Sequence, residues 1–171
     1  MGRTGVITFK GNPMTLLGED LAVGSPAPPF SLIYADAGLQ ELTLDDLKGK
    51  PSIISVVPSL DTPTCAIQTK RFNQDLGTLG DKINAVTVSR DLPFAQARFC
   101  GAEDVSMRTA SDYQTHAFGT DYGLTIDELK LLTRAVVILD AEGNVAYKEI
   151  VAEVTEEPDY DAAMAALRML L

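Results

Sequence analysis

The sequence predicts an α/β fold: a central mixed sheet flanked by helices, with an N-terminal β-hairpin extension. Three observations predict it. Short β-branched runs alternate with helix-like segments between residues 52 and 109, the order of parallel strands joined by right-handed helical crossovers. Two apolar runs on either side of a turn at 141–144 indicate an antiparallel hairpin. The last segment of the chain carries one apolar helical face.

The first 50 residues contain short apolar runs separated by glycine and proline. Gly11-Asn12-Pro13 divides residues 5–10 from 14–17, which predicts the hairpin. The proline-rich connector 24–29 is too short to divide domains. Three further elements follow in order: a strand at 30–34, its partner strand at 39–43, and a short helical turn at 44–47.

The middle of the chain supplies the alternating part of the fold. Its expected elements are a strand at 52–57, a helix at 63–76, a strand at 83–89, a helix at 93–100 with Gly101 as C-cap, a strand at 105–109 and a helix at 112–118. After it come strands at 135–140 and 145–151 and a terminal helix at 160–171. A parallel half followed by an antiparallel hairpin and a terminal helix is the element order of a thioredoxin-like fold.

Length, composition and charge limit both the number of domains and the kinds of binding partner that the chain could have. The 171 residues, 46% hydrophobic and 22% charged, suit a single domain spanning 1–171, with 1–18 as its hairpin, and exclude a disordered chain. The formal net charge of −10, without any Lys/Arg cluster, argues against nucleic acid and anionic membranes as partners. No apolar run approaches the roughly 18 residues of a membrane helix, so we expect a cytoplasmic protein.

Cys65 is the strongest candidate for chemistry. Pro63 suits the first position of the helix at 63–76, with Asp61 or Thr62 as N-cap, so Cys65 falls in the first helical turn. Unpaired backbone N–H groups and the positive end of the helix dipole meet there, a setting that favours the thiolate over the thiol. The competing interpretation is a buried apolar cysteine, but the polar run 58–64 supplies hydroxyls and backbone control where packing alone would use apolar residues.

Two blocks resemble one family. Pro58, Thr62 and Cys65 match the active-site motif of the peroxiredoxins, and residues 89–100, ending in Cys100, resemble the resolving-cysteine block of its bacterial thiol peroxidase branch. Other stretches resemble the same branch, so that the resemblance covers essentially the whole chain: Gly11-Asn12-Pro13, residues 24–28, residues 134–137 and residues 157–160. Thr64 departs from the aliphatic residue usual in that branch, and residues 126–132 are short and charged where many members have a glycine-containing loop.

The resemblance implies an enzyme that reduces hydrogen peroxide and organic hydroperoxides, an antioxidant activity. Cys65 would be the peroxidatic thiol, with Thr62, Arg134 and Pro58 around it, and Cys100 would be the resolving thiol that forms an intramolecular disulfide with Cys65. It further implies thioredoxin as reductant, a homodimer, and neither metal nor organic cofactor. Because the two cysteines lie on different helices, we expect the helix around each to unwind locally before they join.

Three alternatives stay open at this level. A permanent Cys65–Cys100 disulfide would stabilise the fold by about 4 kcal/mol through chain entropy. A Cys65/His116 hydrolase pair is conceivable, although His116 lies in an amphipathic segment typical of a packed or surface histidine. A non-catalytic redox sensor would use the same thiols as a switch without repeated turnover.

Overall fold

The central feature of the computed structural model, which describes residues 2–171, is a seven-stranded sheet. Its strand order is β11-β10-β5-β6-β7-β3-β4. The strands are β3 (Ser31–Ala35), β4 (Leu39–Thr43), β5 (Ser52–Val56), β6 (Asn84–Ser89), β7 (Arg108–Ser111), β10 (Ala135–Leu139) and β11 (Val145–Ile150).

The sheet is mixed, as the sequence predicts. Strands β5, β6 and β7 are parallel, whereas β10 runs antiparallel to both β5 and β11. Strands β3 and β4 form an antiparallel pair at the other edge. All five residues of β5 and all five of β10 are buried, which agrees with strands covered on both faces. This confirms the thioredoxin-like fold.

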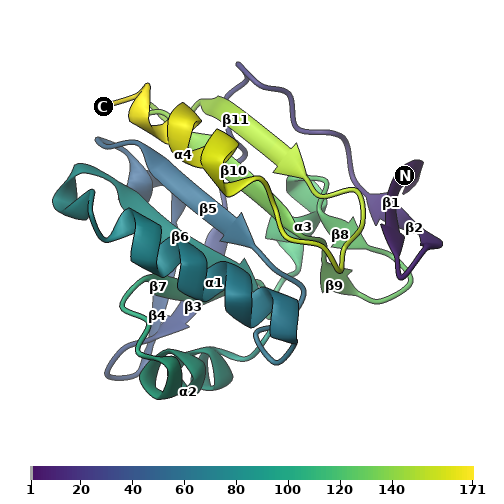
Figure 1. Ribbon diagram of the computed structural model, residues 1–171, viewed down its shortest axis with the longest axis horizontal. Helices are drawn as coiled ribbons and strands as arrows, with labels where there is room; N and C mark the ends of the chain where they lie inside the picture. Colours follow the sequence, from purple (N-terminus) through teal and green to yellow (C-terminus); the bar gives the residue numbers. More distant parts are fainter. Residues whose placement is uncertain (1) are drawn as a thin grey trace.

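Helices cover the two faces of the sheet. In Figure 1, α1 (Pro63–Leu76) and α4 (Tyr160–Arg168) lie in front of it, where Phe72 and Leu167 pack against Ile53 and Val136 in one apolar cluster. The apolar cluster on the other face of the sheet contains Ile54 and the alternate side chains of β10, together with residues of η1 (Leu44–Leu47) and α3 (Ala117–Asp121). The period-two alternation along β5 and β10 therefore divides the core into two layers. A short 3₁₀ turn, η2 (Gly80–Lys82), precedes β6.

The N-terminal hairpin belongs to a second, four-stranded sheet of order β1-β2-β8-β9. Strands β1 (Gly2–Phe9) and β2 (Asn12–Leu17) pair antiparallel. The other edge of β2 pairs antiparallel with β8 (Thr125–Ile126), which in turn pairs antiparallel with β9 (Leu131–Leu132). Lys130, at φ 57, holds the left-handed conformation in the β8–β9 turn that a glycine would otherwise supply. This explains how the charged segment 126–132 makes its turn without a glycine.

The prediction that Gly101 caps the second helix is wrong. Helix α2 (Pro93–Glu103) continues through Gly101, and Asp104, at φ 55, is the left-handed C-cap whose N–H donates to the carbonyl of Cys100. Aspartate tolerates this conformation better than most residues, and glycine is permitted in a last helical turn. Cys100 therefore lies one turn inside the helix.

The strand expected at 105–109 begins later, at Arg108, because the preceding amides have another acceptor. The Oδ1 atom of Asn73 on α1 accepts hydrogen bonds from the backbone N–H groups of Ser106 and Met107, at 3.0 and 2.9 Å. These two residues are thereby held against α1, and sheet pairing starts two residues after Ser106.

The helix expected at 112–118 is also displaced. His116, at φ 60, is the N-cap of α3, which begins at Ala117. The Asp112 carboxylate accepts hydrogen bonds from the N–H groups of Phe118 and Gly119, so a residue outside the helix satisfies the free N–H groups of its first turn. At the C-terminus α4 ends at Arg168, three residues before the expected end. Within residues 2–171 we find no helix of the length and apolarity that crossing a membrane demands.

Candidate active site

Cys65 lies where the sequence predicts, in the first turn of α1. Thr62 is the N-cap, with extended backbone, and Pro63 occupies the first helical position. The Cys65 side chain is fully buried in a small apolar cluster with Val57 and Leu60, against which Phe99 of α2 packs. The thiol is thus shielded from bulk water at the positive end of a helix.

Arg134 reaches this sulfur from the start of β10, the strand that pairs antiparallel with β5. It directly precedes β10, is only 2% exposed, and its Nη2 lies 3.3 Å from Cys65 Sγ. A guanidinium cannot lose its proton in a protein, so this contact places a fixed positive charge beside the sulfur.

Two further hydrogen bonds aim the guanidinium. Arg134 Nε donates to the carbonyl of Val154 at 2.7 Å, and Nη1 donates to Gln68 Oε1 at 2.9 Å. Gln68 in turn donates from Nε2 to the hydroxyl of Ser55 on β5 at 2.8 Å, and both side chains are fully buried. This chain of contacts links β5, α1 and β10 around the sulfur. Sequence reasoning missed Gln68 and Ser55, although Gln68 stands three positions after Cys65 and therefore on its helical face.

Thr62, Pro58 and Arg134 line one cavity of about 290 Å³ beside the buried thiol. Its remaining walls come from α1 (Pro63, Thr64), from the hairpin (Phe9, Lys10) and from the segment before α4 (Val154, Thr155). The Thr62 hydroxyl donates to the carbonyl of Ser59 at 3.0 Å, which leaves its oxygen lone pairs free to accept from a bound molecule. Pro58 is buried. The structure therefore brings Cys65, Thr62, Pro58 and Arg134 together.

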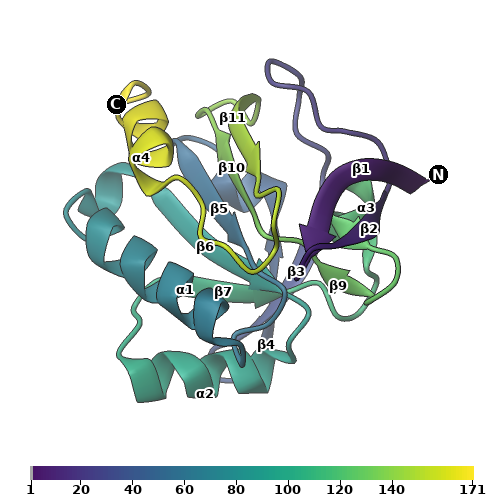
Figure 2. The ribbon, with the colours of Figure 1, turned by 45° about the vertical axis from the view of Figure 1, so that its right-hand side comes forward.

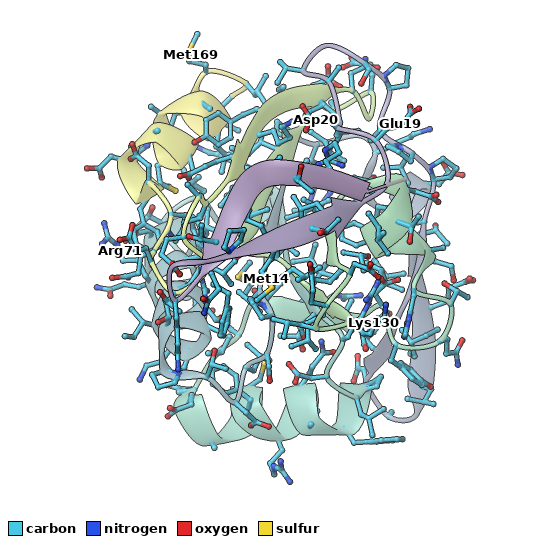
Figure 3. The ribbon with its side chains drawn as sticks, turned by 90° about the vertical axis from the view of Figure 1, so that its right-hand side faces the viewer. Met14, Glu19, Asp20, Arg71, Lys130 and Met169 are labelled. Atoms are coloured by element: carbon cyan, nitrogen blue, oxygen red, sulfur yellow. The ribbon has the colours of Figure 1, made fainter. Side chains whose placement is uncertain are left out.

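Residues 153–155, here called the strap, form a segment whose Val154 and Thr155 make one wall of this cavity. Thr64 Oγ1 donates to the carbonyl of Thr155 at 3.2 Å, which ties the first turn of α1 to the strap. Glu153 accepts from the Thr155 hydroxyl and N–H and from the N–H groups of Lys10 and Gly11 in the hairpin turn. The hydrogen bonds from Thr155 above all, followed by the one from the Gly11 N–H, hold the pKa of Glu153 well below its usual range. Figure 3 shows the hairpin, with Met14 labelled on β2, crossing the face of the molecule turned toward the viewer.

Cys100 occupies a different environment. It is partly buried on α2, and its Sγ lies 3.8 Å from Thr109 Oγ1 of β7. Burial raises the pKa of the Cys100 thiol, and the Thr109 hydroxyl offsets part of this effect. Both cysteines are free. In Figure 2, α2 lies at the bottom, beside β7 and well away from α4.

The hydrolase alternative finds no support in the geometry. His116 is exposed at the start of α3, and its backbone carbonyl accepts from Arg90. The hydrogen-bond partner of Cys65 Sγ is Arg134, not a histidine. Across residues 2–171, no group of three or more His, Cys, Asp or Glu side chains is arranged to hold a metal ion.

A thioredoxin-like fold with a buried thiol at a helix start beside an arginine is typical of the thiol enzymes of the peroxiredoxin class. Comparison with known proteins is consistent with this class. Residues 22–164 match the Redoxin family. The thiol peroxidase of Bacillus subtilis strain 168 is 47% identical over 166 residues, covering 96% of this chain and 98% of the relative. That of Streptococcus sanguinis is 48% identical over 164 residues, covering 95% and 99%.

A solved structure agrees over the whole chain. The crystal structure of a peroxiredoxin-like protein from Aquifex aeolicus superposes with a TM-score of 0.90 at 39% identity, covering 99% of this chain and 100% of the other. The chain belongs to the Redoxin family, among its thiol peroxidases. It is a peroxiredoxin-type enzyme, as the sequence resemblance implies.

Proposed function

We propose that the chain reduces hydroperoxides through Cys65, and the contact between Arg134 Nη2 and Cys65 Sγ at 3.3 Å carries this assignment. The Cys65 thiolate attacks one oxygen of the peroxide, and the O–O bond breaks. The sulfur keeps that oxygen and its hydrogen as a sulfenic acid, and the other oxygen leaves as hydroxide or alkoxide, which takes up the proton released when the Cys65 thiol ionised and becomes water or an alcohol. Sulfur is oxidised by two electrons and the peroxide is reduced by two.

The neighbouring residues have distinct roles in this step. Thr62 accepts a hydrogen bond from the peroxide and holds it in line with the sulfur. Arg134 stabilises both the thiolate and the negative charge that grows on the leaving oxygen. Pro58 keeps water from the thiolate. The shared cavity that these three residues line supports the assignment.

The same cavity bears on the substrate. Phe9, Pro58 and Val154 give it apolar walls, and about 290 Å³ is far more than hydrogen peroxide occupies. This supports organic hydroperoxides as substrates in addition to hydrogen peroxide.

Cys100 completes the cycle in this proposal. Its thiol attacks the Cys65 sulfenic acid, an intramolecular disulfide forms and water leaves. A dithiol reductant, for which we propose thioredoxin, then attacks the disulfide and returns both cysteines to thiols. The supporting observations are the free state of both cysteines and their location on the consecutive crossover helices α1 and α2.

We also propose that the enzyme is a cytoplasmic homodimer. Two large apolar side chains at the start of α2, Leu92 and Phe94, are 54% and 63% exposed and give a second copy an apolar surface to contact. Sedimentation equilibrium of the reduced protein tests the dimer, and a monomer at micromolar concentration would contradict it.

A coupled assay tests the activity. The enzyme is mixed with thioredoxin, thioredoxin reductase and NADPH, and NADPH oxidation is followed with hydrogen peroxide and with cumene hydroperoxide. We expect repeated turnover with both peroxides. A single stoichiometric oxidation followed by no turnover would favour a redox sensor instead.

A further inference from the structure

One carboxylate, Asp91, joins the loop that precedes Cys65 to the start of the helix that carries Cys100. Its Oδ1 accepts from the Ser59 hydroxyl at 2.7 Å, and its Oδ2 accepts from the Leu60 backbone N–H at 2.8 Å. Ser59 and Leu60 belong to the turn between β5 and α1, and Thr62 is hydrogen-bonded back to Ser59. Asp91 therefore fixes the turn that sets the position of Thr62 and Cys65.

Asp91 is also connected to α2, both through the chain and through hydrogen bonds. It directly precedes Leu92, the N-cap of that helix. The Ser89 hydroxyl donates to Asp91 Oδ2 at 2.7 Å and accepts from Gln96 Nε2 of α2 at 2.9 Å. Gln96 is fully buried, and its amide also donates to the carbonyl of Ala110 in β7. The contact thus runs from the Cys65 loop through Asp91 into the first turn of α2.

Disulfide formation requires that this arrangement open. Cys65 is fully buried behind Val57 and Leu60, and Cys100 is engaged beside Thr109. Phe99 packs both against the Cys65 cluster and against the separate cluster that Cys100 joins. Burial also keeps the Cys100 thiol protonated by raising its pKa, whereas its attack requires the thiolate.

We infer that Asp91 is a positioning residue that clamps the Cys65 loop to α2 and thereby sets how fast the sulfenic acid is resolved. The inference rests on the proposed function of Cys65 and Cys100. With the clamp closed, Leu60 and Thr62 keep Cys65 beside the cavity that Arg134 lines, where peroxide reacts. With the clamp open, the Cys65 sulfenic acid meets the Cys100 thiol, the disulfide forms and water leaves.

This predicts opposite responses of the two chemical steps when the clamp is weakened. Asp91→Ala removes hydrogen bonds to a charged acceptor, so the open state becomes more populated and disulfide formation is expected to accelerate about tenfold. The closed state still dominates, so the peroxide step slows by no more than about threefold. Formation of sulfinic acid per turnover falls, because the sulfenic acid is trapped sooner.

The experiment is rapid-quench oxidation of the reduced enzyme with one equivalent of hydrogen peroxide, followed by mass spectrometry. Loss of free Cys65 thiol reports the peroxide step, and appearance of the Cys65–Cys100 crosslink reports resolution. Asp91→Asn keeps the side-chain volume, and Ser59→Ala removes a single donor, so both serve if Asp91→Ala does not fold. We expect each to accelerate resolution, Ser59→Ala least. Asp61→Asn removes a carboxylate from the same turn whose side chain takes no part in this network, and both of its rates should match the wild type.

The outcomes separate the two claims. Unchanged or slower resolution in Asp91→Asn and Ser59→Ala, with a normal crosslink in the wild type, would overturn the clamp alone. A parallel fall of both rates would assign Asp91 a purely structural role and would also overturn it. Absence of the crosslink in the wild type would remove the proposed role of Cys100 and the clamp with it.

Discussion

At the scale of single residues, the proposed mechanism requires that the guanidinium of Arg134 is held against the Cys65 sulfur. Its three side-chain contacts go to the carbonyl of Val154, to Gln68 and to the Cys65 sulfur. The first two acceptors are uncharged, so the positive charge of the guanidinium acts on the sulfur without a competing buried carboxylate.

Removing either of the polar side-chain groups proposed to contact the reacting atoms should slow the peroxide step. Thr62→Val deletes the hydroxyl, and Arg134→Met deletes the charge while keeping an unbranched side chain. Each is expected to lower the second-order rate constant with peroxide by roughly 10² or more, the usual size for the loss of a preorganised polar group in an active site. Stopped-flow measurement of the peroxide reaction provides the test. A rate within a few-fold of the wild type would remove that residue from the site.

We expect Gln68 to affect the rate of the peroxide step only by positioning Arg134. In Gln68→Met the buried Nη1 of Arg134 loses its acceptor and Ser55 loses its donor, so we expect the peroxide rate to fall about tenfold. Gln74→Met, on the exposed face of the same helix, is the matched control and should react normally. Equal rates for the two variants would show that Arg134 needs no support from Gln68.

The residues of the site were predictable from sequence to different degrees. Pro58, Thr62 and Cys65 are close together in the chain, so local motif and helix-start signals place them. Arg134 came only from family resemblance, because its contact with Cys65 depends on the antiparallel pairing of β10 with β5. Glutamine is a residue type usual on helix surfaces, so the sequence gives no sign that Gln68 is buried and hydrogen-bonded to Ser55.

At the scale of elements, strands and helices with strong patterns were predicted well, and elements set by tertiary hydrogen bonds were not. The helix at 63–76 and the strand at 39–43 have the predicted bounds. The start of β7 depends on Asn73 of another helix, and α3 depends on the Asp112 carboxylate, so local periodicity gives neither. Strands β8 and β9 have two residues each, too few for a period-two pattern.

The location of Cys100 on a helix separate from Cys65 gives a prediction at this scale. Cys100→Ser should still react once with peroxide at close to the normal rate, since its thiol takes no part in that step. The product should be a stalled Cys65 sulfenic acid that is open to further oxidation to sulfinic acid. Trapping with dimedone followed by mass spectrometry detects the first species, and thioredoxin-dependent turnover should fall sharply. Unimpaired turnover would mean that another thiol resolves the sulfenic acid.

At the scale of the whole molecule, the N-terminal hairpin is connected to the active site through the strap. Glu153 accepts from Thr8, Lys10 and Gly11 of the hairpin, and the adjoining Val154 carbonyl accepts from Arg134. Hairpin, strap and site therefore form one connected structure. The sequence predicted the hairpin from its turn residues, but its attachment to residue 153, far along the chain, could not be inferred from local pattern.

The attachment predicts a pH dependence of stability. Since the pKa of Glu153 is lowered in the folded state, its contribution is complete above the ordinary glutamate pKa of 4.5 and is lost progressively as the pH falls below that value. Glu153→Gln should thus lower Tm at pH 7, and its difference from the wild type should shrink at pH 3. Glu156→Gln, an exposed neighbour, is the control for thermal unfolding at both pH values. A difference that does not change with pH would contradict the role of the Glu153 charge.

The most direct test of the central claim is mass spectrometry of the wild-type protein after one equivalent of peroxide. Cys65 as nucleophile and Cys100 as its partner predict a single crosslink between them within one chain, together with loss of both the crosslink and all turnover in Cys65→Ser. A crosslink between two chains, or substantial turnover in Cys65→Ser, would contradict the account.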